Sequence, residues 1–282
     1  APVGGATVAL SSDNVAATVP SSVTVVQGNS SATFPVITTS VASLATVTIT
    51  GVYNATRTAT LTVNPAVLSS VSLSPSSLTG GTSSTGTATL TGPAPAGGAV
   101  VALSDDSSSA NTPASVTVPE GATGATFTIT TSAVASSTPV IISVVYGGAT
   151  ETATLTIAPP ALSSVAMNPT SVIGGNSSTG TVTITGPAPA GGVAVTLSDD
   201  STAATTPPSA TVAAGATSAT FTVTTSGVNT GTTVTVTGDY NGSQSGAFTI
   251  NPPALSSLAV TPTSVVGGNS STGTVTLNGP AP

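Results

Sequence analysis

The acidic residues are the side chains of this sequence best suited to chemistry, and four of them form two matching pairs. Asp105 and Asp106 make the first pair, and Asp199 and Asp200 make the second, each directly after an alternating apolar run. Paired carboxylates beside loop carbonyls can hold calcium, which takes about six to eight oxygen ligands. Aspartate also favours turns, because its side chain bonds to nearby backbone. The pairs therefore indicate either weak calcium sites or, more simply, solvated turns.

Five Asn-x-Ser/Thr sequences are a second set of candidate sites, because this pattern is the acceptor for N-linked glycans. They begin at Asn29, Asn54, Asn176, Asn241 and Asn269. A chain this rich in Ser and Thr also produces the pattern by chance. Glycans that add solubility, and no modification at all, are both open readings of these positions.

The remaining composition excludes most catalytic and nucleic-acid chemistry. Histidine, cysteine and tryptophan are absent, and Arg57 is the single basic residue among 282. Zinc, haem and iron–sulfur sites, and Ser-His-Asp or Cys-His catalysis, need residues that are missing here. A chain of net charge −7 cannot neutralise nucleic-acid phosphates. No apolar run reaches the ~18 residues of a membrane span. We therefore expect a protein that is not an enzyme, with no cofactor and no membrane span.

The elements that must position these residues repeat along the chain. The sequence LSSV begins at Leu68 and again at Leu162, and LSSL begins at Leu255, at spacings of 94 and 93 residues. The similarity continues as SSTGTATLTGPAPAGG, SSTGTVTITGPAPAGG and SSTGTVTLNGPAP. A period of this length suits one small domain. The sequence predicts tandem domains.

Within each period, apolar residues alternate with threonine, as in ATFTVT over residues 219–224. Such alternation predicts strands with one buried face. Between residues 68 and 161 we expect strands near 68–73, 77–79, 85–91, 99–104, 114–118, 123–131, 138–146 and 150–157. The Asn-Gly pair at 241–242 predicts a hairpin turn. About seven short strands per period predict an all-β fold of tandem immunoglobulin-like β-sandwiches joined head to tail.

Several motifs resemble those of bacterial Ig-like tandem repeats. They are the LSSV start, the NPTSVIGGNSSTGTVT stretch that begins at Asn168, the GATSATFTVTT strand and the Tyr-Asn-Gly hairpin. The resemblance covers the whole chain. It implies a structural or adhesive role outside the cell or on its surface, as in stalks, adhesins and fibres, and it carries no active site.

The two ends of the sequence match complementary parts of one repeat. Residues 1–67 align with a repeat that lacks its first strands, and residues 255–282 align with those first strands alone. We call residues 1–67 the head and residues 255–282 the tail. The predicted domains are therefore the partial head, complete domains at 68–161 and 162–254, and a tail that completes the head of the next subunit.

The predicted joint depends on apolar tail residues that occupy core positions in the alternation. They are Leu255, Leu258, Val260, Val266, Val275 and Leu277. The partner would be a second copy of this chain, which makes a head-to-tail homopolymer, or the same joint would arise inside a longer continuous chain. The function expected is a structural subunit of an extracellular filament or surface fibre. The alternative is the stalk of a surface adhesin that presents a binding module elsewhere.

Overall fold

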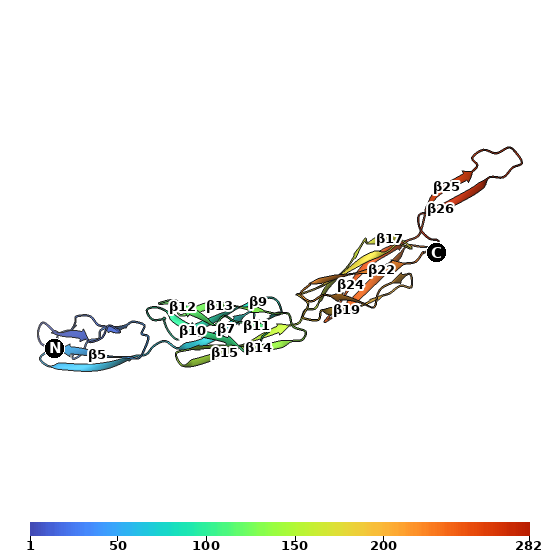
Figure 1. The fold of residues 1–282 in the computed structure, drawn as a ribbon. Helices are drawn as coiled ribbons and strands as arrows, with labels where there is room; N and C mark the ends of the chain where they lie inside the picture. Colours follow the sequence, from blue (N-terminus) through green and yellow to red (C-terminus); the bar gives the residue numbers. More distant parts are fainter. The chain divides into compact units, whose positions relative to one another are not determined.

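The computed structural model describes all residues, 1–282, and consists of strands, turns and loops without a helix (Figure 1). The predicted all-β class is confirmed. No segment qualifies as a helical membrane span. The chain divides into two compact units, one of residues 1–76, 83–130 and 139–155 and the other of residues 77–82, 131–138 and 156–282. The domain limits at 68–161 and 162–254, which come from the sequence repeats, stay a prediction. They keep all the strands of each sheet within one domain.

The repeat at 162–254 forms two sheets with the strand orders β17-β24-β23-β19-β21 and β16-β18-β22-β20. Its strands are β16 (Leu162–Asn168), β17 (Ser171–Ile173), β18 (Ser178–Ile184), β19 (Val193–Asp199), β20 (Ala204–Thr205), β21 (Ser209–Val212), β22 (Ser218–Thr225), β23 (Thr232–Asp239) and β24 (Ser243–Asn251). All neighbours pair antiparallel except β17, which pairs parallel with β24. This is an immunoglobulin-like β-sandwich.

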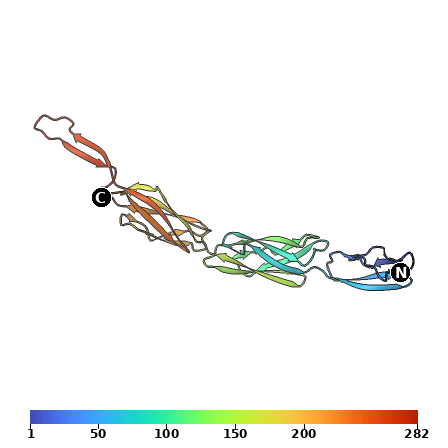
Figure 2. The ribbon, with the colours of Figure 1, turned by 180° about the vertical axis from the view of Figure 1, so that it is seen from behind.

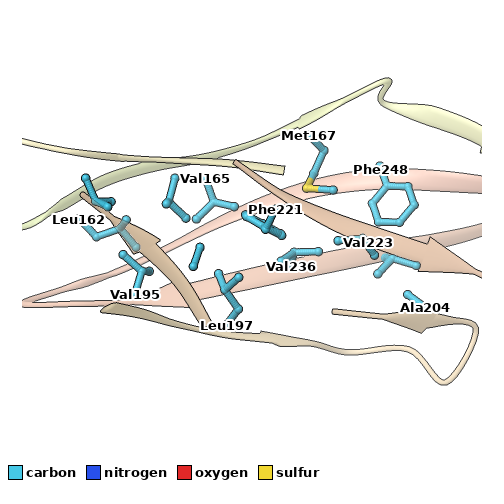
Figure 3. Close-up of a cluster of buried hydrophobic side chains, with 14 of the residues drawn as sticks. Leu162, Val165, Met167, Val195, Leu197, Ala204, Phe221, Val223, Val236 and Phe248 are labelled. Carbon is cyan, nitrogen blue, oxygen red and sulfur yellow. The ribbon is translucent and has the colours of Figure 1, made fainter. Parts of the chain in front are cut away.

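The core of this sandwich follows from the alternation, because successive side chains of a strand point to opposite faces of the sheet. On β23, Val234 and Val236 are fully buried while their threonine neighbours stay at least partly accessible. Figure 3 shows Val165 and Met167 of one sheet pointing into the same interior as Val195 and Leu197 of the other. β-Branched residues suit such half-buried surfaces.

The repeat at 68–161 forms the same pair of sheets, with the orders β12-β10-β14-β15-β8 and β11-β13-β9-β7. Its strands are β7 (Leu68–Ser74), β8 (Ser77–Thr79), β9 (Ser83–Leu90), β10 (Ala99–Asp105), β11 (Ala110–Asn111), β12 (Ser115–Val118), β13 (Gly124–Thr131), β14 (Thr138–Tyr146) and β15 (Ala149–Ala158). The eight predicted strands are confirmed to within about two residues at each end, which is the usual uncertainty of strand limits. The two-residue strand β11 was not predicted, because it is too short to alternate.

The predicted Asn-Gly hairpin lies between β23 and β24, where Tyr240 N–H donates to the carbonyl of Gly242 over 3.0 Å. Asn241 has φ +48° and Gly242 has φ +138°, conformations that most side chains avoid. The turn therefore depends on these two residue types.

The head forms a single four-stranded sheet of order β3-β1-β5-β6, with a separate pair of two-residue strands, β2 and β4. Its strands are β1 (Ala6–Ser12), β2 (Ala17–Thr18), β3 (Ser22–Val25), β4 (Ile37–Thr38), β5 (Ala45–Val52) and β6 (Thr56–Val63). The tail forms only the hairpin of β25 (Leu255–Thr261) and β26 (Thr272–Leu277). Figure 2 shows this hairpin in red, as two strands with no third beside them.

Candidate functional site

The first two long strands of a complete repeat supply a quarter of its buried core, five of the 20 residues in the cluster of the repeat at 162–254. In the repeat at 162–254, β16 contributes Leu162, Val165 and Met167, and β18 contributes Val182 and Ile184. All five belong to one cluster and are at most 6% exposed. They pack against β19, β21 and β23, whose inward residues are buried to the same degree (Figure 3). A sheet equivalent to the one formed by β19, β21, β23 and β24 would have an exposed apolar face if β16 and β18 were missing.

The head contains such a sheet. Its pairing of Ala6 with Val25 corresponds to that of Val193 with Val212 in the complete repeat. Likewise, β5 pairs with β6 in the register in which β23 pairs with β24. The registers agree because the same alternating sequence and the same short turns set them. The head is therefore built correctly as half of a sandwich.

An apolar groove of about 360 Å³ lies on the uncovered face of this sheet. It is lined by Val8, Leu10, Val23, Val25, Ser31, Ala32, Phe34, Ile49, Gly51, Arg57, Thr58 and Ala59. Val8 and Leu10 are half-exposed here, whereas their equivalents Val195 and Leu197 are buried. The groove is the face that β16 and β18 cover in the complete repeat.

The segment at residues 31–38 shows what an unpaired strand becomes. Its equivalent in the complete repeat is the eight-residue strand β22, which pairs along β18. In the head only Ile37 and Thr38 remain in strand conformation, paired with β2. A strand needs a neighbour for its backbone groups. Residues 31–38 align with this strand, with Pro35 in place of Thr222 and Ile37 in place of Thr224, and they lack the neighbour along which β22 pairs.

The tail hairpin has the same internal geometry as β16 and β18. Leu255 pairs with Leu277 as Leu162 pairs with Ile184. In both hairpins the register then shifts by one residue, between Leu255 and Ser257 in the tail and between Leu162 and Ser164 in the repeat. Ser271 Oγ donates to the carbonyl of Pro262 over 2.7 Å, the bond that Ser178 makes in the complete repeat. The tail is therefore formed in the conformation that a sandwich requires.

The apolar side chains of the tail are uncovered. The six residues singled out from the sequence are 39–78% exposed; they are Leu255, Leu258, Val260, Val266, Val275 and Leu277. Their equivalents are buried in the complete repeat, except that Val266 aligns with the half-buried Ile173. The adjacent Val265 aligns with Val172, which is 7% exposed. The equivalence thus favours Val265, which sequence reasoning missed, over Val266 as the residue that a joint would bury.

Arg57, expected from the sequence at an exposed polar position, lies on β6 beside the groove. Its side chain is exposed, and Nη1 donates to the carbonyl of Thr56 over 3.3 Å. Apart from Arg57, the lining of the groove carries no charge. The lining of the groove is therefore mainly apolar and uncharged.

Each aspartate of the two pairs accepts a hydrogen bond from a backbone N–H group, and we call such a bond a tie. Asp106 Oδ1 accepts from Ile141 N–H over 2.9 Å, and Asp200 Oδ1 accepts from Thr235 N–H over 2.8 Å. Asp105 and Asp199 each accept an N–H seven residues further along the chain. No three carboxylates gather into a metal-binding cluster. The calcium interpretation gains no geometric support.

The tie from Thr235 N–H lowers the pKa of the Asp200 carboxyl below its ordinary value of 3.8. The equivalent tie from Thr48 lowers the pKa of Asp13. A carboxyl whose pKa falls on folding stabilises the folded state above its unfolded pKa, and this contribution is lost as the pH drops through the folded value. The ties should therefore weaken only in acid.

We expect Asp200→Asn to remove part of the acid sensitivity of the repeat at 162–254. The native chain should lose stability as the pH falls below the ordinary carboxyl pKa of 3.8, and the variant should lose less. Denaturant titrations at a series of pH values, followed by circular dichroism, measure the difference. Asp239→Asn on β23 is the control of equal charge. An identical acid slope in native and Asp200→Asn chains would rule out the tie as its cause.

Four of the five Asn-x-Ser/Thr positions do not hydrogen-bond through their side-chain amide. Asn29, Asn54, Asn176 and Asn269 are exposed. Asn241 differs, because its Nδ2 donates to the carbonyl of Pro160 over 3.0 Å. Asn241 is thus the position at which a glycan would be attached to a nitrogen that already donates a hydrogen bond.

Two sheets of these strand orders, repeated along the sequence, define a protein of tandem immunoglobulin-like β-sandwiches. No family model and no curated protein matches the sequence. Solved structures that are similar to it include the D0-D1 domain of intimin and the bacterial integrin-binding protein invasin. Intimin has a TM-score of 0.28 and 16% identity over 65% of this chain and 98% of that one. Invasin has a TM-score of 0.39 and 16% identity over 91% of this chain and 55% of that one.

A fragment of titin, I67-I69 from the I-band, is similar at a TM-score of 0.33 and 8% identity, over 88% of each chain. The chain spans about half the length of the invasin chain that it matches. Similarities at this level carry no information on function.

Proposed function

We propose that this chain is a structural, non-enzymatic subunit of an extracellular filament or surface fibre. In the proposed joint, the tail hairpin of one copy covers the groove of the next copy's head and completes its sandwich. Strand addition of this kind supplies backbone hydrogen bonds for affinity and side-chain pockets for specificity.

The observation that supports the joint is that the two uncovered faces correspond to the two halves of a sandwich that this chain already builds within itself. The groove residues Val8 and Leu10 are equivalent to Val195 and Leu197, and the hairpin residues Leu258 and Val275 are equivalent to Val165 and Val182. In the repeat at 162–254 these four positions belong to one buried core, in which Figure 3 shows Val165, Val195 and Leu197.

The occupant of the groove is thus a second copy of the chain. Each buried Leu or Val side chain is worth about 1.5–3 kcal/mol relative to exposure. The tail exposes seven such residues, six of them at positions that are buried in the complete repeat, and the segment at residues 31–38 would gain a strand partner. The same contact would therefore bury apolar side chains of the tail and supply a strand partner to the head.

A contact between two different surfaces propagates unless the rotation closes a ring. Each copy carries one head and one tail, so an assembly of any length keeps one free head at one end and one free tail at the other. The expected assembly is an unbranched filament. Joints between successive repeats of a longer polypeptide would have the same geometry, and a surface stalk remains the second candidate function.

The proposal is tested by the assembly state of the purified chain. Negative-stain electron microscopy should show uniform, unbranched filaments with a constant axial repeat. An excess of a synthetic peptide of residues 255–282 should shorten them, because it fills heads without offering a new one. The same peptide with Val275→Asp is the control. A chain that stays single at all concentrations, or filaments indifferent to the peptide, would overturn the proposal.

A further inference from the structure

Both complete repeats place a phenylalanine ring on a glycine of the neighbouring strand. Phe127 pairs with Gly86, and Phe221 pairs with Gly180. A Cβ atom added at either glycine would overlap the ring of its partner, with the Cζ atom as the first contact. The two rings are 6% and 7% exposed. In each sandwich the ring therefore occupies the space that any other residue at the glycine would fill.

The same two residue types are present in the chain but separated. Gly273 is the tail equivalent of Gly180, and nothing lies within 4 Å of a Cβ atom built on it. Phe34 is the head equivalent of Phe221 and lines the groove half-exposed. The glycine thus lies in the tail, and the phenylalanine lies in the head that the tail is proposed to cover.

We propose that the ring of Phe34 in one copy packs on Gly273 of another copy and that this pair sets the register of the joint. The inference rests on the proposed function and specifies how the two segments recognise each other. With Phe34 opposite Gly273, the pairing seen along β18 and β22 places Val275 opposite Ala32.

Such a determinant is needed because the alternation of the tail does not fix its register alone. A slip of one residue turns apolar side chains outward and is excluded by their burial. A slip of two residues keeps every side chain on its own face, since strands have a period of two. That slip would bring Ser271 or Val275 under the ring of Phe34, where only glycine leaves room. The glycine therefore excludes the slip that alternation permits.

The test isolates one joint by using two full-length chains. A receiver carries Val275→Asp, so only its head is active, and a donor carries Leu10→Asp, so only its tail is active. The two should form a dimer and stop, and sedimentation equilibrium gives its dissociation constant. Donors carrying in addition Gly273→Val or Thr272→Val are then compared on receivers with Phe34 or with Phe34→Ala.

Gly273→Val should weaken association with the Phe34 receiver by roughly 10- to 100-fold, the range expected for overpacking a core. On the Phe34→Ala receiver the same change should cost much less, because the ring is gone. Thr272→Val is the control, since its equivalent Thr179 is exposed. A merely weakened hairpin would cost the same on both receivers, and that result would overturn the pair. Failure of the parent donor and receiver to associate would instead overturn the proposed function.

Discussion

Chains carrying Val275→Asp are expected to form no filaments and to remain single in solution. The equivalent residue, Val182, is fully buried between the sheets of its repeat. Burial of an uncharged polar group without a hydrogen-bond partner costs about 2–7 kcal/mol, and burial of an unpaired carboxylate costs more. Filament length by negative stain measures the effect. In thermal unfolding of the same variant, the two complete repeats should behave as in the native chain, because they take no strand from the tail.

The matched control is Ala259→Asp on the same hairpin. Its equivalent, Ala166, is exposed in the complete repeat, so a charge at this position stays in water after assembly. This variant should assemble like the native chain. Normal filaments from Val275→Asp would show that the tail does not enter a sandwich. Loss of assembly in both variants would show that charge on the hairpin matters and that its position does not.

The second large effect is expected from Phe248→Ala in the repeat at 162–254. Phe248 on β24 is 2% exposed and is the largest side chain that is fully buried. Truncation of a buried phenylalanine to alanine typically costs about 3–5 kcal/mol, from lost burial and the cavity that remains. The unfolding transition of this repeat should therefore move to clearly lower denaturant concentration.

Denaturant unfolding followed by far-ultraviolet circular dichroism provides the measurement, and the transition of the repeat at 68–161 serves as an internal reference. Ser245→Ala on the same strand is the control, because this side chain is exposed. A shift of less than about 1 kcal/mol, the size of an average substitution, would contradict the assignment of Phe248 to a rigid core.

The strands of the complete repeats were predictable because their signal is local. Alternation over four to eight residues identifies a strand and its buried face without knowledge of its neighbours, as β13 and β14 illustrate. Residues 31–38 also place Ala32, Phe34 and Val36 in alternation, although Pro35 lacks a backbone N–H, and in the head only β4 forms there. Whether a strand forms depends on a partner, and the alternation within a segment does not show whether a partner is present.

The tail residues of the candidate joint were largely predictable from repeat position, and its register determinant was not. Leu258 and Val275 follow from alternation, whereas the choice between Val265 and Val266 depends on the parallel pairing of β17 with β24. The pairing of Phe221 with Gly180 joins residues that lie far apart in sequence. A glycine inside a threonine-rich strand gives no local sign that a ring covers it.

The aspartate ties were hidden for the same reason. Each of Asp13, Asp106 and Asp200 accepts an N–H from a strand 35 residues away. Turn chemistry explains the local preference for aspartate but not this distant bond. Recognition of the tie requires the two strands to be placed side by side.

The position of Arg57 has a consequence for proteolysis. Proteases that cut after Lys or Arg have one cleavable bond in this chain, since there is no second basic residue. That bond lies within β6, where Arg57 pairs with Gly51 of β5, the second pair from the turn end of the sheet's longest ladder. Cleavage requires a strand to leave its ladder and enter the protease, so this bond is protected except during local opening. A chain with so few basic residues offers such proteases almost no entry, and its one cleavable bond reports on the opening of the head alone.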